Sequence, residues 1–146
     1  MKLRIASPDE AIAARAQVGA HLRERAAADS DIAAAELIVS ELVSNALKHG
    51  GGDGGASLTL HWEDEWAVLH VVSAGDPFDL PVGLPEEPGS GSGRGLFLVA
   101  KFSLGLAIER EDDANRVRAV LPVRNRKAAR ASSSQGAESG ERGQSP

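Results

Sequence analysis

Residues 36–50 read ELIVSELVSNALKHG, and this stretch carries two helical patterns at once. A polar pattern holds Glu41, Asn45 and Lys48. Residues at i, i+4 and i+7 of a helix point in the same direction, so these three form one stripe. Glu41 and Asn45 are therefore expected about 6 Å apart along the helix axis. The apolar residues recur at steps of three and four, as on one face of an α-helix: Leu37, Ile38, Leu42, Ala46 and Leu47.

The polar stripe carries groups suited to phosphoryl transfer. The amide oxygen of Asn45 is a ligand type that Mg²⁺ accepts, since this ion binds few protein groups and keeps several waters. Glu41, one turn earlier, is placed to orient or deprotonate an attacking hydroxyl or water. A surface helix with a solvated polar face is the alternative, and this stretch alone leaves it open.

A second informative stretch, residues 89–99, reads GSGSGRGLFLV. Its glycine run passes directly into an apolar segment that can be helical. Backbone N–H groups at the positive end of a helix form a site for phosphate. A flexible glycine-serine linker is the alternative for this stretch taken alone.

Together, the two stretches resemble the ATP-binding superfamily of histidine kinases and gyrase, the GHKL or Bergerat fold. In that family a Glu-x-x-x-Asn helix and a GxG-Leu loop face each other across the nucleotide. The closest resemblance is to small bacterial anti-sigma factors that are also serine kinases. It is carried by ELIVSELVSNALKHG, GRGLFLV and GDPFDLP at residues 75–81, and it covers residues 1–123.

The resemblance implies a histidine-kinase-like ATPase domain at residues 1–123, folded as a two-layer α/β (α+β) sandwich. A mixed, mostly antiparallel sheet would carry three helices on one face. ATP and Mg²⁺ would bind between the helix of residues 36–50, a lid at residues 76–93 and the glycine loop. A linker is the alternative reading of residues 76–93, which contain four prolines and four glycines.

The same resemblance assigns roles to individual residues. Asn45 is expected to ligate Mg²⁺, and Glu41 to act as the base toward a serine hydroxyl. Arg94 is expected to add charge near the γ-phosphate, or else to be a solvent-exposed lid residue. The remaining cofactor-binding positions are the loop residues whose backbone N–H groups face phosphate and the strand end on the adenine side: Gly93, Gly95, Leu96, Ser73 and Gly75.

Two departures from the family pattern fall on the adenine side. Aligned on Gly75, the sequence has Ser73 where the family has an Asp that accepts a hydrogen bond from the adenine amino group. It also has Ala114-Asn115-Arg116 where the family carries Gly-Thr before the last strand. The phosphate and metal side keeps its residues.

Two functions of different classes follow. In the first, the protein is an anti-sigma factor in a stress-response or sporulation pathway. It sequesters a sigma factor and, using ATP and Mg²⁺, phosphorylates a serine of an anti-anti-sigma (STAS-type) antagonist. In the second, it is a sigma-binding regulatory module with weak or no ATP binding and no kinase activity. Glu41 with Asn45 favours the first, whereas Ser73 and Asn115 favour the second. The resemblance also implies a homodimer.

Composition restricts these functions further. The 146-residue chain has a net charge of −5, and residues 124–146 hold five Lys/Arg and two Asp/Glu, which leaves −8 for residues 1–123. An acidic body of this kind argues against direct nucleic-acid binding and is compatible with a basic protein partner. The chain lacks cysteine, which excludes disulfides and thiolate metal sites. With no membrane-spanning run and no N-terminal signal, a cytoplasmic location is expected.

Other segments are predicted from local patterns. Ser7, Pro8 and Glu10 form a capping box that starts a helix. His61 and His70 fall on strands with no third ligand at a recognisable spacing, so no zinc site is expected. The tail lacks large apolar residues and is expected to be disordered. In order, the prediction is strand 2–6, helix 7–28, helix 31–49, strands 58–63 and 66–73, loop 76–93, helix 93–102, strands 104–108 and 117–121, and tail 124–146.

Overall fold

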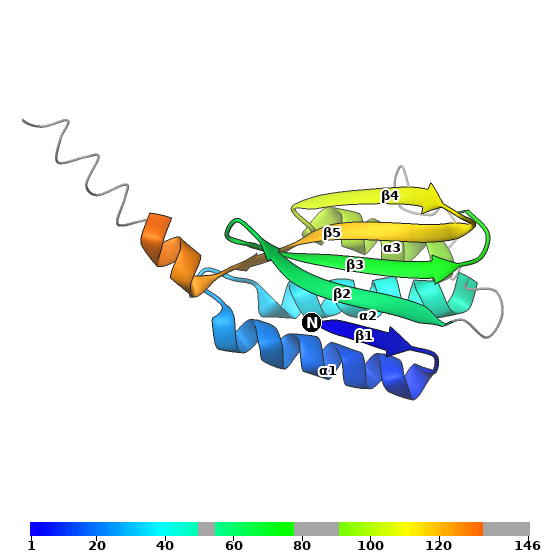
Figure 1. The fold of residues 1–146 in the computed structure, drawn as a ribbon, viewed down its shortest axis with the longest axis horizontal. Coiled ribbons are helices and arrows are strands. Elements are labelled where there is room, and N and C mark those ends of the chain that lie inside the picture. Colours follow the sequence, from blue (N-terminus) through cyan, green and yellow to red (C-terminus); the bar gives the residue numbers. More distant parts are fainter. Residues whose placement is uncertain (50–54, 78–90, 133–146) are drawn as a thin grey trace, which may run out of the picture.

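The computed structural model describes residues 1–49, 55–77 and 91–132. Most of the predicted loop 76–93 and the last part of the predicted tail lie outside these ranges. Each predicted helix and strand is present close to its expected place (Figure 1). In chain order the elements are β1 (Lys2–Ile5), α1 (Pro8–Arg25), α2 (Ile32–His49), β2 (Ala56–Glu63), β3 (Trp66–Ala74), α3 (Gly91–Phe102), β4 (Gly105–Glu111) and β5 (Ala114–Arg124).

The described strands form one sheet in the order β1-β2-β3-β5-β4, and every neighbouring pair is antiparallel. The prediction of a mixed sheet is corrected on this point. Two of the pairs are hairpins, and their tight turns place Asp64, Asp112 and Asp113 at φ values of 55°, 50° and 62°. Aspartate tolerates this left-handed conformation, which suits the twist of a two-residue hairpin.

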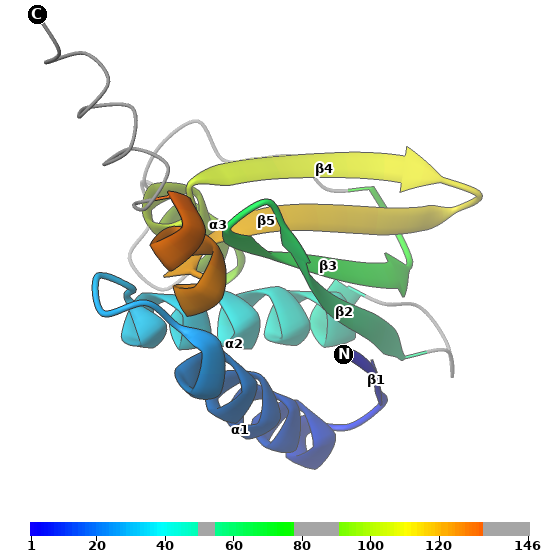
Figure 2. The ribbon, with the colours of Figure 1, turned by 60° about the vertical axis from the view of Figure 1, so that its left-hand side comes forward.

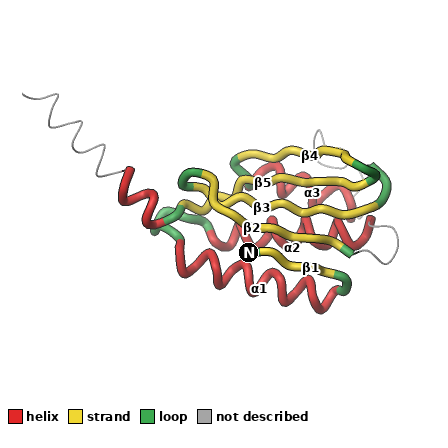
Figure 3. Tube along the Cα trace, viewed as in Figure 1, coloured by secondary structure: helices red, strands yellow, loops and turns green. Residues whose placement is uncertain are grey.

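The molecule has two layers, as the resemblance implied. α1, α2 and α3 cover one face of the sheet (Figures 1, 2 and 3). α2 lies between α1 and α3 and packs beneath β2, β3 and β5. Because side chains alternate across a strand, each strand sends every second residue to the helix side. We call the opposite side, which carries His70 and Val72 of β3, the outer face.

Side-chain caps fix where the first two helices begin. Ser7 Oγ accepts a hydrogen bond from the Glu10 N–H at 3.2 Å, so Ser7 is the N-cap of α1 as predicted. Asp31 caps α2, because its Oδ1 accepts a hydrogen bond from the Ala34 N–H at 3.0 Å. The Asp31 N–H in turn donates to the Pro122 carbonyl of β5 at 2.9 Å. The N-terminus of α2 is thereby tied to the far end of β5.

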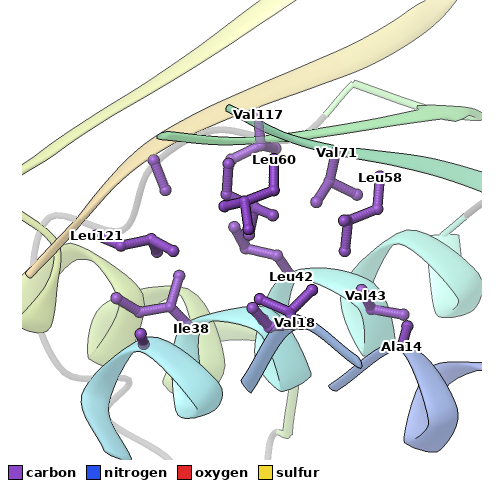
Figure 4. Packing of buried hydrophobic residues seen from close by; sticks show 14 of the residues in the cluster. Ala14, Val18, Ile38, Leu42, Val43, Leu58, Leu60, Val71, Val117 and Leu121 are labelled. Carbon is purple, nitrogen blue, oxygen red and sulfur yellow. The ribbon is translucent and has the colours of Figure 1, made fainter. Parts of the chain in front are cut away.

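The apolar stripe of α2 forms the centre of the core (Figure 4). Ile38, Leu42 and Val43 are 2% exposed or less. They face buried side chains of α1 and of the sheet. A fully buried Val, Leu or Ile side chain contributes about 1.5–3 kcal/mol to stability. The side chains shown there with them include Ala14, Val18, Leu58, Leu60, Val71, Val117 and Leu121.

The chain continues in a regular way beyond the predicted domain end. β5 includes Arg124, and residues 126–132 are helical, which adds a fourth helical segment to the three expected. Asn125 explains this difference, because its Oδ1 accepts hydrogen bonds from the N–H groups of Lys127 and Ala128 and caps the segment. The expectation of a disordered tail is therefore wrong for residues 124–132, and residues 133–146 lie outside the described part.

We predict that Leu42→Ala lowers the free energy of unfolding by about 2–5 kcal/mol, because the substitution leaves a cavity beneath the sheet. Ser44→Ala, at an exposed position on the same helix, is the matched control and should change it by less than about 0.5 kcal/mol. Urea denaturation followed by circular dichroism measures both. Equal effects of the two substitutions would contradict the assignment of this face to the core.

Candidate functional site

Four elements bring polar groups to one end of the sheet. The N-terminus of α2 is bound to Pro122, so its C-terminal half extends toward the opposite end, where β3 finishes and β5 begins. The orientation of α3 is fixed just after its C-terminus, where the Leu104 N–H donates a hydrogen bond to the Val120 carbonyl of β5 at 2.8 Å. The first turns of α3 therefore point toward this same end of the sheet, alongside the second half of α2.

Glu41 of α2 lies against the backbone of α3. A Cβ placed on Gly95 would overlap Glu41 Oε2 and lie 3.3 Å from Glu41 Cδ. The Glu41 carboxylate thus occupies the space that any side chain at position 95 would need. The structure therefore places Glu41 beside the glycine stretch.

Asn45 lies one turn beyond Glu41 on the same helix and is half-buried. Lys48, the third residue of the polar stripe, is exposed. The opposite face of α2 packs in the core through residues that include Leu42 and Ala46. The polar stripe is therefore neither buried in the core nor fully solvated. It lies toward the end of the sheet where β3 finishes and β5 begins.

α3 begins at Gly91, two residues earlier than predicted. Only the first four N–H groups of a helix lack an intrahelical partner. Gly93 belongs to these, whereas Gly95 and Leu96 lie in the second turn, where N–H groups bond to the carbonyls four residues before them. The phosphate contacts of Gly95 and Leu96 stay predictions, and the structure adds a packing role for each residue. Gly95 permits the close approach of Glu41, and Leu96 is 6% exposed and packs in the core.

Ser73 and Asn115, the two departures from the family pattern, are partners across the sheet. They face each other in the register of β3 and β5, and they are the two buried polar residues of the described chain, at 4% and 1% exposure. Asn115 Nδ2 donates to the Asp76 carbonyl at 2.9 Å, and its Oδ1 accepts from Arg110 Nη1 at 3.2 Å. The amide of Asn115 is thus occupied by contacts within the protein.

Arg110 was missed by sequence reasoning. Its Nη1 also donates to the Gly75 carbonyl at 2.7 Å, so one guanidinium holds both Gly75 and Asn115. Gly75 has a φ of 129°, a conformation that side chains rarely adopt, which accounts for glycine at this turn. No local pattern could have revealed Arg110, because it is 35 residues from Gly75 and meets it only through the pairing of β4 with β5.

Comparison with known proteins agrees with this geometry. Residues 5–121 match the family described as the histidine kinase-like ATPase domain. The chain belongs to this family. A search of curated proteins found no match. None of the helices within the described ranges is long and apolar enough to cross a membrane.

Membership in the family implies nucleotide binding, usually with Mg²⁺, and the described residues fit this on one side. Glu41, Asn45 and the start of α3 offer a carboxylate, an amide oxygen and unpaired N–H groups at one place. At the end of β3, the amide of Asn115 is occupied by contacts within the protein, and the Ser73 hydroxyl lies beside it across the strand pair. Arg94 lies in the first turns of α3.

We predict that Gly95→Ala displaces the Glu41 carboxylate while the fold is retained, because the added methyl overlaps the flexible end of a side chain. Gly105→Ala is the matched control, since its Cβ would meet Val120 Cγ2 at 3.4 Å, an ordinary contact. The rate at which ATP with Mg²⁺ is converted to ADP should fall for Gly95→Ala and remain at the wild-type value for Gly105→Ala. A wild-type rate for Gly95→Ala would show that the contact has no bearing on the site.

Proposed function

We propose that this chain is an ATP- and Mg²⁺-dependent serine kinase that also acts as an anti-sigma factor. It would sequester an RNA polymerase sigma factor and phosphorylate a serine of a STAS-type antagonist. The observation that carries the proposal is the contact of Glu41 with the α3 backbone at Gly95, one turn from Asn45. A homodimer and a cytoplasmic location belong to the same proposal.

Each residue has a defined task in this proposal. Asn45 holds Mg²⁺ through its amide oxygen, and the unpaired N–H groups at the start of α3, including that of Gly93, receive phosphate oxygens. Glu41 orients the serine hydroxyl and accepts its proton. Arg94, in the first turns of α3, would add positive charge near the γ-phosphate. Bound ATP supplies the phosphoryl group, and the metal ion neutralises the charge that develops during transfer.

A sigma-binding module with weak or no ATP binding is the second candidate. The contacts of Asn115 favour it, since this side chain holds the Asp76 carbonyl and Arg110 rather than offering a free group to a base. Ser73 then provides a hydroxyl where the family has a carboxylate, which weakens the hold on adenine. The two candidates differ in one measurable property, the Mg²⁺-dependent binding of ATP.

We predict that Glu41→Gln lowers phosphoryl transfer by about 100-fold or more, the usual contribution of a general base, while ATP binding changes little. Asn45→Ala should instead abolish the Mg²⁺ dependence of ATP binding. ADP production with recombinant STAS-domain proteins measures transfer, and calorimetry measures binding. Ser44→Ala, exposed on the same helix, is the control and should leave both at wild-type values. Full turnover by Glu41→Gln would exclude Glu41 as the base.

We predict that Ser73→Asp tightens ATP binding and increases the preference for ATP over GTP. A hydrogen bond to a charged group contributes about 1.5–3 kcal/mol, or on the order of ten- to a hundredfold in affinity. The double variant Ser73→Asp with Asn115→Thr changes both members of this cross-strand pair. It serves as a second test in case an aspartate at position 73 does not fit beside Asn115. Calorimetric titration with both nucleotides decides the matter. If neither variant binds ATP more tightly than the wild type, the base is not read at this position.

A further inference from the structure

The outer face of the sheet, opposite the helices, carries a cluster of titratable side chains. His61 and Glu63 are two residues apart on β2 and therefore point to the same side. His70 of β3 pairs with Thr59, so it lies diagonally across from His61 on that side as well. One ligand atom from each of the three residues lies within 4.8 Å of the others.

The contacts within this cluster are specific. His61 Nε2 lies 2.9 Å from Glu63 Oε1, and the rings of His61 and His70 are stacked with centroids 5.0 Å apart and an interplanar angle of 15°. The other oxygen of Glu63 forms an ion pair with Arg118, which pairs with His70 in the register of β3 and β5. Both imidazoles are half-buried and Glu63 is exposed, so the cluster is open to solvent on one side.

These donors match those of a known class of metal site. Two imidazoles, one carboxylate and a water form a common set of ligands for Zn²⁺, with bonds of about 2.0–2.2 Å and hence ligand atoms roughly 3.3 Å apart. The separations here approach that value, and rotation of the terminal torsions, which have broad minima, can close the difference. The β2–β3 pairing fixes the three Cα positions, so little backbone order has to be gained on binding.

We propose that His61, Glu63 and His70 form a site for a divalent transition-metal ion of the Zn²⁺ type on the outer face of the sheet, with water as the fourth ligand. The sequence prediction of no zinc site considered His61 and His70 without Glu63, which lies two residues from His61 on β2, and the β2–β3 register brings His70 beside both. The site lies on the face opposite α2 and α3 and is separate from the proposed nucleotide site.

Arg118 affects the affinity of the proposed site although it is not a ligand. Its guanidinium pairs with Glu63 and places a positive charge beside the position of the metal ion. A bound cation must therefore compete with Arg118 for the carboxylate. Removing the charge of Arg118 should strengthen metal binding, although Arg118 itself donates nothing to the ion.

The test is a titration of the full-length, tag-free protein with Zn²⁺ in competition with a chromophoric chelator at pH 7.5. We expect one equivalent to bind. His70→Ala and His61→Ala should each lose at least about tenfold in affinity, because even loss of a ligand's hydrogen-bond partner commonly costs 10–100-fold. Arg118→Gln should bind more tightly than the wild type. His49→Gln, at the end of α2, is the matched histidine control and should bind like the wild type.

Substitution with Co²⁺ reports on the coordination directly, since a tetrahedral site gives intense visible absorption bands that an octahedral aqua ion lacks. These bands should appear with the wild type and Arg118→Gln and be absent with His70→Ala. No stoichiometric uptake of Zn²⁺ by the wild type would overturn the proposal. Unchanged affinity in His70→Ala, or weaker binding by Arg118→Gln, would overturn it too. The gain expected for Arg118→Gln cannot arise from misfolding, which keeps the test decisive.

Discussion

The approach of the Glu41 carboxylate to the backbone of Gly95 is the constraint on which the rest of the site depends. α2 cannot withdraw from α3 to accommodate a side chain at position 95, because its opposite face is packed into the core through Ile38 and Leu42. One helix thus has two surfaces with coupled roles. The apolar surface holds the helix against the sheet, and the polar surface presents Glu41 and Asn45 at a fixed distance from the start of α3.

The other side of the site depends on hydrogen bonds between side chains and backbone. Arg110 and Asn115 together bind the carbonyls of Gly75 and Asp76, so the turn after β3 is held by groups from β4 and β5. Asn115 therefore has a structural task at this end of the sheet. Its amide is occupied by Arg110 and the Asp76 carbonyl, and Ser73, its partner across β3 and β5, is the other buried polar residue in the described ranges.

Local patterns predicted the helices and strands, and the family resemblance supplied the two-layer fold. The three- and four-residue period of residues 36–50 gives the orientation of Glu41 and Asn45 directly, because helix geometry depends only on spacing. What local patterns missed depends on register or on a single side chain. Asn125 caps a helix in a segment that lacks large apolar residues, whereas Arg110 meets Gly75, and His70 meets His61, only through strand pairing. Strand pairing joins residues that are distant in sequence, and a single amino-acid sequence does not directly indicate which strands pair or in which register.

The central claim is that the end of the sheet between α2 and α3 binds ATP with Mg²⁺. Backbone amide NMR of the wild-type protein, titrated with ATP in the presence and absence of Mg²⁺, tests it most directly because it locates binding residue by residue. The account predicts Mg²⁺-dependent shifts in the C-terminal half of α2, at the start of α3 and around Ser73 and Asn115, with the outer-face residues His70 and Arg118 unchanged. Saturating ATP that shifts no amide in α2 or α3, or that shifts only the outer face, would contradict it.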